Sequence, residues 1–163
     1  MYADKVKARA TKGLDAEWGF HLNRPFYIRT KMITGRTVEA LPNGNLVLRT
    51  IFKDRKPQMF TFSGIAKTIE SIEYPGKSLD IEEAGKSANL RLFKTNARWF
   101  QMFRIKGDYL VNERGLVVEI QGNRDNENSN IGIGKLRNAK TQQWIIAYAD
   151  ELVLSYEPGE LNP

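Results

Sequence analysis

Short runs in which apolar and polar residues alternate recur along this chain about every forty residues. In each of the clearest runs an asparagine leads an apolar, variable, apolar pattern, at residues 45–48, 89–92 and 130–133. Such a period of two places successive side chains on opposite faces of an extended strand, and the intervening segments are rich in Gly, Asn, Lys and Pro, as turns are. The pattern predicts short β-strands joined by turns.

Two further blocks accompany each alternating run in the same order. Before the run, a glycine is followed three residues later by an aliphatic residue, an acid and another apolar residue. After it, a glutamine precedes a large aromatic residue by two positions. The distance from asparagine to glutamine is 13, 12 and 12 residues in the three copies. We therefore infer a threefold internal repeat, in which each block is predicted to be a strand.

Three copies of this length predict one architecture. A unit of about forty residues with a few short strands cannot bury its apolar face alone, so the copies must share a core. A propeller needs about four to eight blades, and three units are too few. The sequence predicts a closed, all-β threefold barrel capped by hairpins, with repeats at about 25–69, 70–111 and 112–151.

The three Gln-x-aromatic signatures, each preceded by an acid in an apolar pair and an asparagine-led strand, resemble the β-trefoil domains of the ricin B-chain type, the R-type lectins. The resemblance spans residues 25–151. It departs from the usual pattern in having Phe in place of Trp in two copies, and Pro57, Phe100 and Thr141 in place of the asparagine that often precedes the glutamine. More narrowly, residues 77–151 look like the tandem ricin-type trefoil domains of ciliated protists.

The resemblance implies a β-trefoil with pseudo-threefold symmetry and a non-enzymatic binding function. In ricin-like trefoils each repeat can form a shallow pocket, where a carboxylate accepts hydrogen bonds from sugar hydroxyls and a ring stacks on the sugar. The corresponding acids are Glu39, Asp80 and Glu119. The position of the ring holds, in the same order, Arg49, Phe93 and Gly134.

Only the middle repeat keeps both an acid and a ring. The resemblance therefore implies a weak carbohydrate pocket at Asp80 and Phe93, supported by Asn89 and Asn96. Phe93 alternates out of phase with its apolar neighbours and is expected to point away from the core. An acid beside Gly and Ser can instead accept backbone N–H bonds in a turn, so a structural role for Asp80 stays open.

The remaining repeat residues are given weaker or structural roles. Equivalents of the middle pocket are expected at Glu39 with Asn45 and at Glu119 with Asn130. The third block is expected to determine the fold rather than to bind a ligand; its residues are Gln58, Phe60, Gln101, Phe103, Gln142 and Trp144.

Composition excludes several classes of function. The 163 residues include no cysteine and one histidine, His21, so disulfides and Cys or His metal clusters are excluded, and His21 is expected to be structural. We predict no enzyme activity and no cofactor. No apolar run approaches the eighteen residues of a membrane span, no signal-peptide core is visible, and a cysteine-free chain suits a reducing compartment, so we expect a cytoplasmic protein.

Charge adds a second candidate surface. The net charge is +6, and residues 25–69 hold eight basic and two acidic residues. In this repeat Arg49, Lys53, Arg55 and Lys56 form a possible anion-binding patch, with an ordinary solvated loop as the alternative. Binding of nucleic acid is not expected, because the patch lacks interleaved rings.

Both ends lie outside the repeats. Residues 1–24 are expected to dock on the barrel through Trp18 and Phe20, and residues 152–163 read as a tail or linker, as in a domain from a tandem array. Partners are expected to be a carbohydrate or glycoprotein. The alternative is a structural or protein-interaction scaffold, for which the aromatic pair Trp99 and Phe100 is a candidate contact.

Overall fold

A computed structural model describes residues 13–84 and 87–154 of the protein. Twelve of its strands form one curled antiparallel sheet, and two more form a short ribbon near the N-terminus. The strands are β1 (Leu14–Asp15), β2 (Phe20–His21), β3 (Phe26–Thr30), β4 (Thr37–Ala40), β5 (Leu46–Arg49), β6 (Phe60–Phe62), β7 (Ile69–Ser71), β8 (Lys77–Ala84), β9 (Ser87–Lys94), β10 (Phe103–Lys106), β11 (Tyr109–Asn112), β12 (Val117–Ile120), β13 (Ile131–Gly134) and β14 (Trp144–Tyr148).

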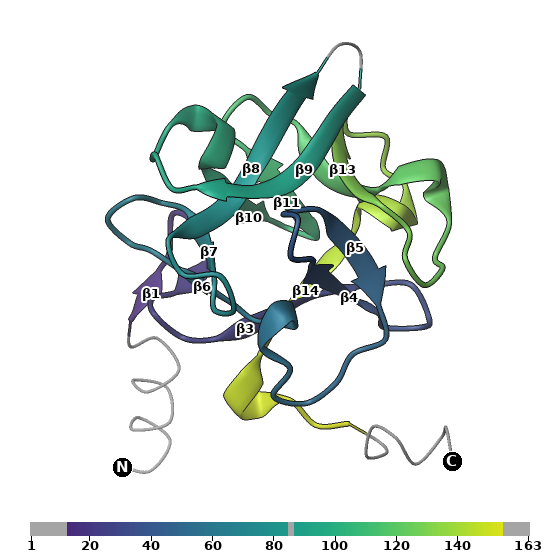
Figure 1. Ribbon diagram of the computed structural model, residues 1–163, viewed down its shortest axis with the longest axis horizontal. Coiled ribbons are helices and arrows are strands. Elements are labelled where there is room, and N and C mark those ends of the chain that lie inside the picture. Colours follow the sequence, from purple (N-terminus) through teal and green to yellow (C-terminus); the bar gives the residue numbers. More distant parts are fainter. Residues whose placement is uncertain (1–12, 85–86, 155–163) are drawn as a thin grey trace.

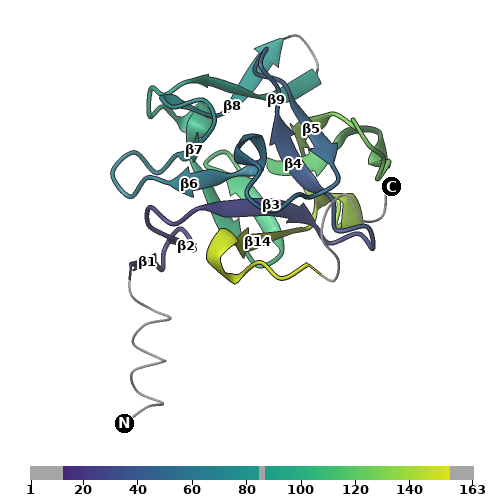
Figure 2. The same cartoon turned by 60° about the horizontal axis from the view of Figure 1, so that its bottom comes forward.

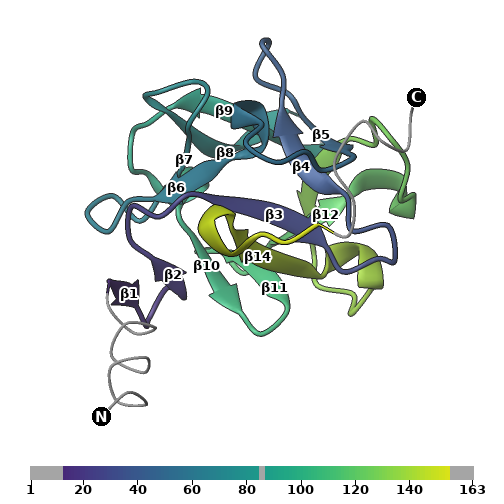
Figure 3. The same cartoon turned by 90° about the horizontal axis from the view of Figure 1, so that it is seen from below.

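Six of these strands close a barrel: β3, β6, β7, β10, β11 and β14. The last strand returns to the first, with Trp144 opposite Thr30 and Tyr148 opposite Phe26. Two neighbouring pairs of barrel strands are joined by few bonds. Beside β7 and β10, Thr68 bridges to Met102. Beside β11 and β14, the Trp144 N–H donates to the Asp108 carbonyl at 2.8 Å. Figure 3 shows these strands from below, with β3 and β14 side by side.

Three hairpins, β4–β5, β8–β9 and β12–β13, cap one end of the barrel. β13 pairs with β9, and isolated bridges link Asn45, just before β5, to Arg91 in β9, and Val47 in β5 to Asn130, just before β13. Figure 1 looks onto the hairpins, and Figure 2 shows β4, β5, β8 and β9 above the barrel strands. Four strands per unit in a barrel-and-hairpin order confirm the predicted β-trefoil with its threefold internal repeat.

The third sequence block differs from the strand that the pattern predicts. Its glutamine ends a 3-10 turn, and only the following aromatic residue begins a strand. The reason is local: each buried glutamine side chain folds back to bond the loop ahead of it, which holds the backbone in a turn. The turns are η1 (Lys56–Gln58), η2 (Trp99–Gln101) and η4 (Lys140–Gln142), and two others are η3 (Gln121–Asn123) and η5 (Ala149–Glu151).

The glycine that opens each first block has a conformational reason. Gly35, Gly76 and Gly115 have φ of +61°, +85° and +84°, in the left-handed region that a side chain disfavours. Each lies in the turn that leads into the first strand of a hairpin. The repeated glycine therefore marks the point at which the chain leaves the barrel for the cap.

The core combines the inner faces of the barrel and of the hairpins. The segment before the first repeat also contributes to it, because Trp18 is 5% exposed and Phe20 is fully buried. The rings of Phe20 and Phe62 stack at 4.5 Å, and the Ile105 N–H donates to the Trp18 carbonyl at 2.9 Å. Residues 13–24 thus belong to the folded body, whereas residues 1–12 and most of the expected tail lie outside the described part of the chain.

Two further observations concern the extent of the repeats and membrane spans. β11 crosses the predicted boundary between residues 111 and 112, since the third set of four strands begins at Tyr109. Among the residues described, no helix has the length and apolar character needed to cross a membrane.

Candidate functional site in the middle repeat

A surface depression of about 270 Å³ lies where β8 and β9 meet the loop that leads into η2. It brings together three of the four residues predicted for the middle pocket: Asp80, Phe93 and Asn96. The fourth, Asn89, does not line it. The other lining residues are Ile81, Arg91, Arg98 and Phe100.

The carboxylate of Asp80 is almost wholly buried and already bonded. Asp80 is 3% exposed, and it lies directly across the hairpin from Arg91. The Arg91 Nε donates to Oδ1 at 3.1 Å, and the Gln101 Nε2 donates to Oδ2 at 3.0 Å. Asp80 therefore holds Arg91 in place and offers little surface of its own to a ligand.

Phe93 supplies the exposed ring of the depression. It is 43% exposed, whereas Leu90 and Leu92 are buried, which confirms the orientation predicted from the alternation. The Arg91 guanidinium carbon lies 4.2 Å from the ring centroid, in a cation–π contact. Arg91 thus links Asp80 to Phe93 and covers part of the ring.

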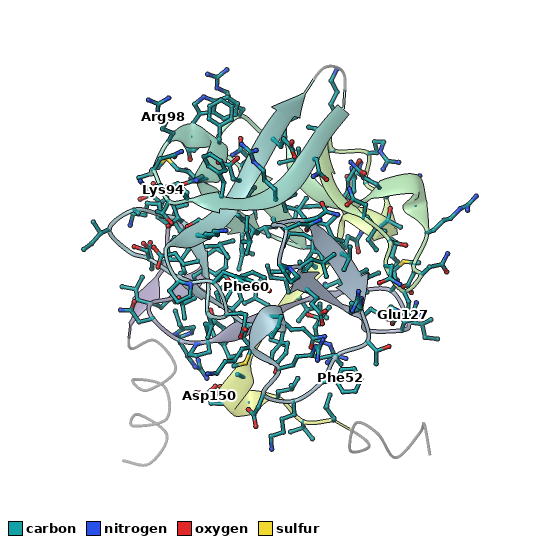
Figure 4. The ribbon with its side chains drawn as sticks, in the orientation of Figure 1. Phe52, Phe60, Lys94, Arg98, Glu127 and Asp150 are labelled. Carbon is teal, nitrogen blue, oxygen red and sulfur yellow. The ribbon has the colours of Figure 1, made fainter. Side chains whose placement is uncertain are left out.

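The loop after β9 forms the opposite wall. Gln101 accepts the backbone N–H of Asn96 at 2.8 Å, and the Asn96 Oδ1 accepts that of Arg98 at 2.9 Å. Among the described residues, neither the Asn96 amide nitrogen nor the exposed Arg98 guanidinium has a partner, so both can bond a ligand; Figure 4 labels Arg98. Trp99 and Phe100 are half-buried and stack on each other at 3.9 Å, and of the two Phe100 lines the depression.

In the first repeat, Glu39 occupies the place of Asp80. It is 3% exposed and accepts bonds from Arg55 Nε at 2.7 Å, Arg49 Nη1 at 3.1 Å and Gln58 Nε2 at 3.1 Å. Burial acts to raise the pKa of Glu39, but the hydrogen bond and charge of Arg55, with Gln58 and Arg49, outweigh it and hold the pKa below its usual value. Arg49 stands at the position of the ring, and the half-buried ring of Phe52 lies under Arg55, whose guanidinium carbon is 5.9 Å from the ring centroid.

The possible anion patch divides in two. Arg49 and Arg55 are paired with Glu39, and Arg49 also donates to Asn128 Oδ1 at 2.6 Å. Lys53 and Lys56 are exposed, and neither makes an ion pair within the described residues. The two arginines are thus partly neutralised by Glu39, and the two lysines are the part of this patch whose charge is not.

In the third repeat, Glu119 accepts bonds from Arg137 Nη2 at 3.1 Å and Gln142 Nε2 at 2.9 Å. Gly134, at the position of the ring, lies beneath this carboxylate: a Cβ there would come within 2.8 Å of the Glu119 Oε2. The acid fills the space that an aromatic side chain would need. All three repeats thus share an acid bonded to a glutamine and to at least one arginine.

The three asparagines of the second block lie together between the hairpins, not in three separate pockets. Asn45 Nδ2 donates to Asn130 Oδ1 at 2.8 Å, Asn130 Nδ2 to Asn89 Oδ1 at 2.7 Å, and Asn89 Nδ2 to Asn45 Oδ1 at 3.2 Å. We call this cycle the asparagine ring. In the sequence, an asparagine recurs at the same position of each repeat. The structure shows why: the three equivalent positions meet near the pseudo-threefold axis.

His21 is the remaining residue singled out in the sequence. Its backbone N–H donates to the Tyr148 hydroxyl at 2.8 Å, and its ring meets that of Tyr148 edge-on at 5.1 Å. Burial raises the pKa of Tyr148 above its usual value, against the backbone bond from His21 and the charge of Arg24. Within residues 13–84 and 87–154, no group of three acids or histidines could hold a metal ion.

Comparisons with solved structures show that the fold is a β-trefoil. No protein-family model and no curated protein matches the sequence. The structure is similar to the designed threefold-symmetric protein ThreeFoil, with a TM-score of 0.64, 16% identity and coverage of 76% of this chain and 97% of that one. It is also similar to the C-half of the earthworm R-type lectin, solved with GalNAc, with a TM-score of 0.62, 15% identity and coverage of 77% and 98%.

A third similar structure is the β-trefoil lectin of the Vibrio vulnificus hemolysin/cytolysin, solved with N-acetyl-D-lactosamine bound. Its TM-score is 0.65 at 12% identity, with coverage of 80% of this chain and 97% of that one. At these identities the likeness shows the fold: a β-trefoil of the kind found in R-type lectins.

Proposed function

We propose that this protein is a non-enzymatic, lectin-like binding domain with one weak carbohydrate site, in the middle repeat. The observation that supports it most is that a single depression combines the exposed ring of Phe93, the free amide of Asn96 and the guanidinium of Arg91. An apolar ring face suits the C–H face of a sugar, and amide and guanidinium donors suit its hydroxyls. The lectins of similar fold are consistent with this class of ligand.

In this proposal Asp80 acts mainly as a positioning residue. Each of its oxygens accepts one bond from the protein, and its side chain is 4% exposed. Its charge orients the Arg91 guanidinium, which in turn lies against Phe93. The sugar contacts Phe93, Asn96 and Arg91, and Asp80 fixes the position of the Arg91 guanidinium.

The other two repeats lack such a surface. Glu39 is enclosed by Arg49, Arg55 and Gln58, and Gly134 carries no side chain on which a sugar could stack. One site per domain gives no avidity, so the affinity for a single sugar is expected to be low.

The test is a titration of the isolated domain with neutral sugars, followed in its amide NMR spectra. Shifts are expected around Phe93 and Asn96, and Phe93→Ala is expected to weaken binding about tenfold, the value of one stacking contact. Ile33→Ala is the control, because Ile33 is a fully exposed apolar residue outside the depression. Binding that survives Phe93→Ala, or shifts confined to the first or third repeat, would contradict the proposal.

A second candidate function is a structural or protein-interaction scaffold that binds no sugar. The observation that favours it is that Arg91 bonds Asp80 and at the same time covers part of the Phe93 ring. If millimolar sugars leave every amide signal unchanged, this reading replaces the first. The stacked pair Trp99 and Phe100 is then the surface to test against protein partners.

A further inference from the structure

A second depression, of about 510 Å³, lies on the other side of the Arg91 and Phe93 pair. Both residues line both depressions, so the pair is a low ridge between them. The second depression extends from the β4–β5 turn across β9 to the start of β8. Its other lining residues are Asn43, Gly44, Asn45, Lys77, Glu82, Asn89, Leu92 and Lys94.

The two depressions together carry more cations than acids. Lys77, Arg91, Lys94 and Arg98 line them, against Asp80 and Glu82. The ion pairs here are those of Arg91 with Asp80 at 3.1 Å and with Glu82 at 4.0 Å. Within the described part of the chain, the other three cations are left without a carboxylate partner.

Lys77 and Lys94 are placed directly opposite each other at the open end of the β8–β9 hairpin. Like charges in directly opposed positions of an antiparallel pair repel and destabilise the hairpin. An anion between or beside them would remove that repulsion. Figure 4 shows Lys94 and Arg98 on the same side of the molecule. Lys77 and Lys94 line the second depression and Arg98 lines the first, so cations lie on both sides of the ridge.

The same surface also holds groups that suit hydroxyls. Glu82 has a side chain that is 39% exposed, and one of its oxygens accepts from Asn89 at 3.2 Å, which leaves further acceptor capacity. Phe93 presents the only ring shared by both depressions. A nucleic acid strand would need several exposed rings in a row, and this surface has one exposed ring, Phe93, with the half-buried Phe100 at its edge.

We propose that the two depressions form one extended site for an acidic oligosaccharide, a chain of sugars that carries carboxylate or sulfate groups. The inference rests on the proposed function, since Phe93 and Arg91 belong to the same carbohydrate site. The sugar at the ridge stacks on Phe93, and the acid groups on either side meet Arg98 in the first depression and Lys77 with Lys94 in the second.

The experiment compares a heparin-derived tetrasaccharide with the same tetrasaccharide after desulfation, re-N-acetylation and reduction of its carboxylates to alcohols, so that the second sugar is neutral, by calorimetry at low salt. We expect the sulfated form to bind about tenfold more tightly, the combined effect of three exposed ion pairs. The double variant Lys77→Ala/Lys94→Ala is expected to lose most of that preference. The matched control is Lys53→Ala/Lys56→Ala, which removes the same charge from the first repeat.

The outcomes separate the inference from the proposed function. Equal binding of the two tetrasaccharides, lost in Phe93→Ala, overturns the acidic specificity and leaves the carbohydrate site. Absence of binding by both overturns both proposals. The inference also fails if the Lys53→Ala/Lys56→Ala variant loses the preference, if inorganic sulfate alone competes at equal concentration, or if a single-stranded oligonucleotide binds more tightly than the sulfated sugar.

Discussion

Replacing Asn130 by alanine tests whether the asparagine ring holds the three hairpins together. Asn130 donates to Asn89 Oδ1 and to Gln121 Oε1, each at 2.7 Å, and accepts from Asn45 at 2.8 Å. Alanine removes all three bonds, and the partners come from three different repeats or turns. No other single substitution in the ring interrupts as many short contacts.

The magnitude follows from the number of bonds lost. A typical hydrogen bond contributes about 0.5–1.5 kcal/mol net, and a partner left unsatisfied away from water costs more. Asn130 is half-buried, so water replaces part of the loss. We expect Asn130→Ala to lower the free energy of unfolding by about 2–4 kcal/mol, measured by urea denaturation.

Asn130→Asp sharpens the test because it changes a donor into a charge while keeping the shape. Near neutral pH the carboxylate faces the acceptor oxygens of Asn89 and Gln121, so the folded state disfavours ionisation and raises the pKa of the new acid. Stability is then highest below the pKa of the unfolded chain, about 4, and is lost as pH rises through the higher folded value. Urea denaturation below about pH 4 and near neutral pH measures how much stability the variant loses when the new acid ionises.

Two results would refute this reasoning. One is a loss below about 1 kcal/mol for Asn130→Ala, which would mean that the ring bonds contribute less than a single ordinary bond. The other is an Asn130→Asp variant whose stability relative to the native protein is the same at both pH values. The control is Asn126→Ala, a change of the same side chain at an exposed position.

Three further predictions concern the buried acids of the first and third repeats and the N-terminal segment. Glu39→Gln is expected to cost about 1–3 kcal/mol near neutral pH, where the carboxylate is ionised, and nothing once pH falls through the lowered pKa of Glu39, as denaturation at both pH values would show. Phe20→Ala is expected to cost about 3–5 kcal/mol in thermal or urea unfolding, because the ring is fully buried against Phe62. Gly134→Ala is expected to cost about 1–3 kcal/mol in urea unfolding, because the new methyl group displaces the Glu119 carboxylate.

Each of these has its own contradicting result. A Glu39→Gln variant that is equally destabilised in acid would show that its charge is not what matters. A Phe20→Ala variant as stable as the native protein would remove residues 13–24 from the core. For Gly134→Ala, an unchanged stability would mean that the Glu119 carboxylate can move aside without loss of its bonds to Arg137 and Gln142.

Much of the fold could be predicted from the sequence, because the relevant signals are local and occur three times. Alternation with a period of two is set by the pleat of a strand, so it predicted the hairpin strands and the outward position of Phe93. The repeated glycine marks a turn with left-handed backbone, because other residues disfavour that conformation. This preference is local and does not depend on the rest of the fold. Three copies of one unit then predicted closure into a threefold barrel capped by hairpins, and the resemblance to ricin-type domains identified it as a β-trefoil.

The candidate site was predicted only in part, for a physical reason. The acid of each repeat is at an equivalent position, but its arginine partners are not: Arg49 and Arg55 in the first repeat, Arg91 in the second and Arg137 in the third. Aligning the repeats therefore could not reveal them. The register of the β8–β9 hairpin puts Arg91 opposite Asp80. Asp80, expected to accept bonds from a sugar, therefore accepts a bond from Arg91 instead.

The sequence by itself determined the hairpin strands, the glycine turns and the threefold repeat, since these depend on neighbours a few residues apart. Only the tertiary structure decided which side chains meet across repeats. Asn45 and Asn130 are 85 positions apart in the chain, and they bond because the barrel closes and draws the three hairpins to one axis. The Arg91 and Phe93 ridge is likewise flanked by the β4–β5 turn, which closure brings to β9, and that arrangement makes two depressions into one surface.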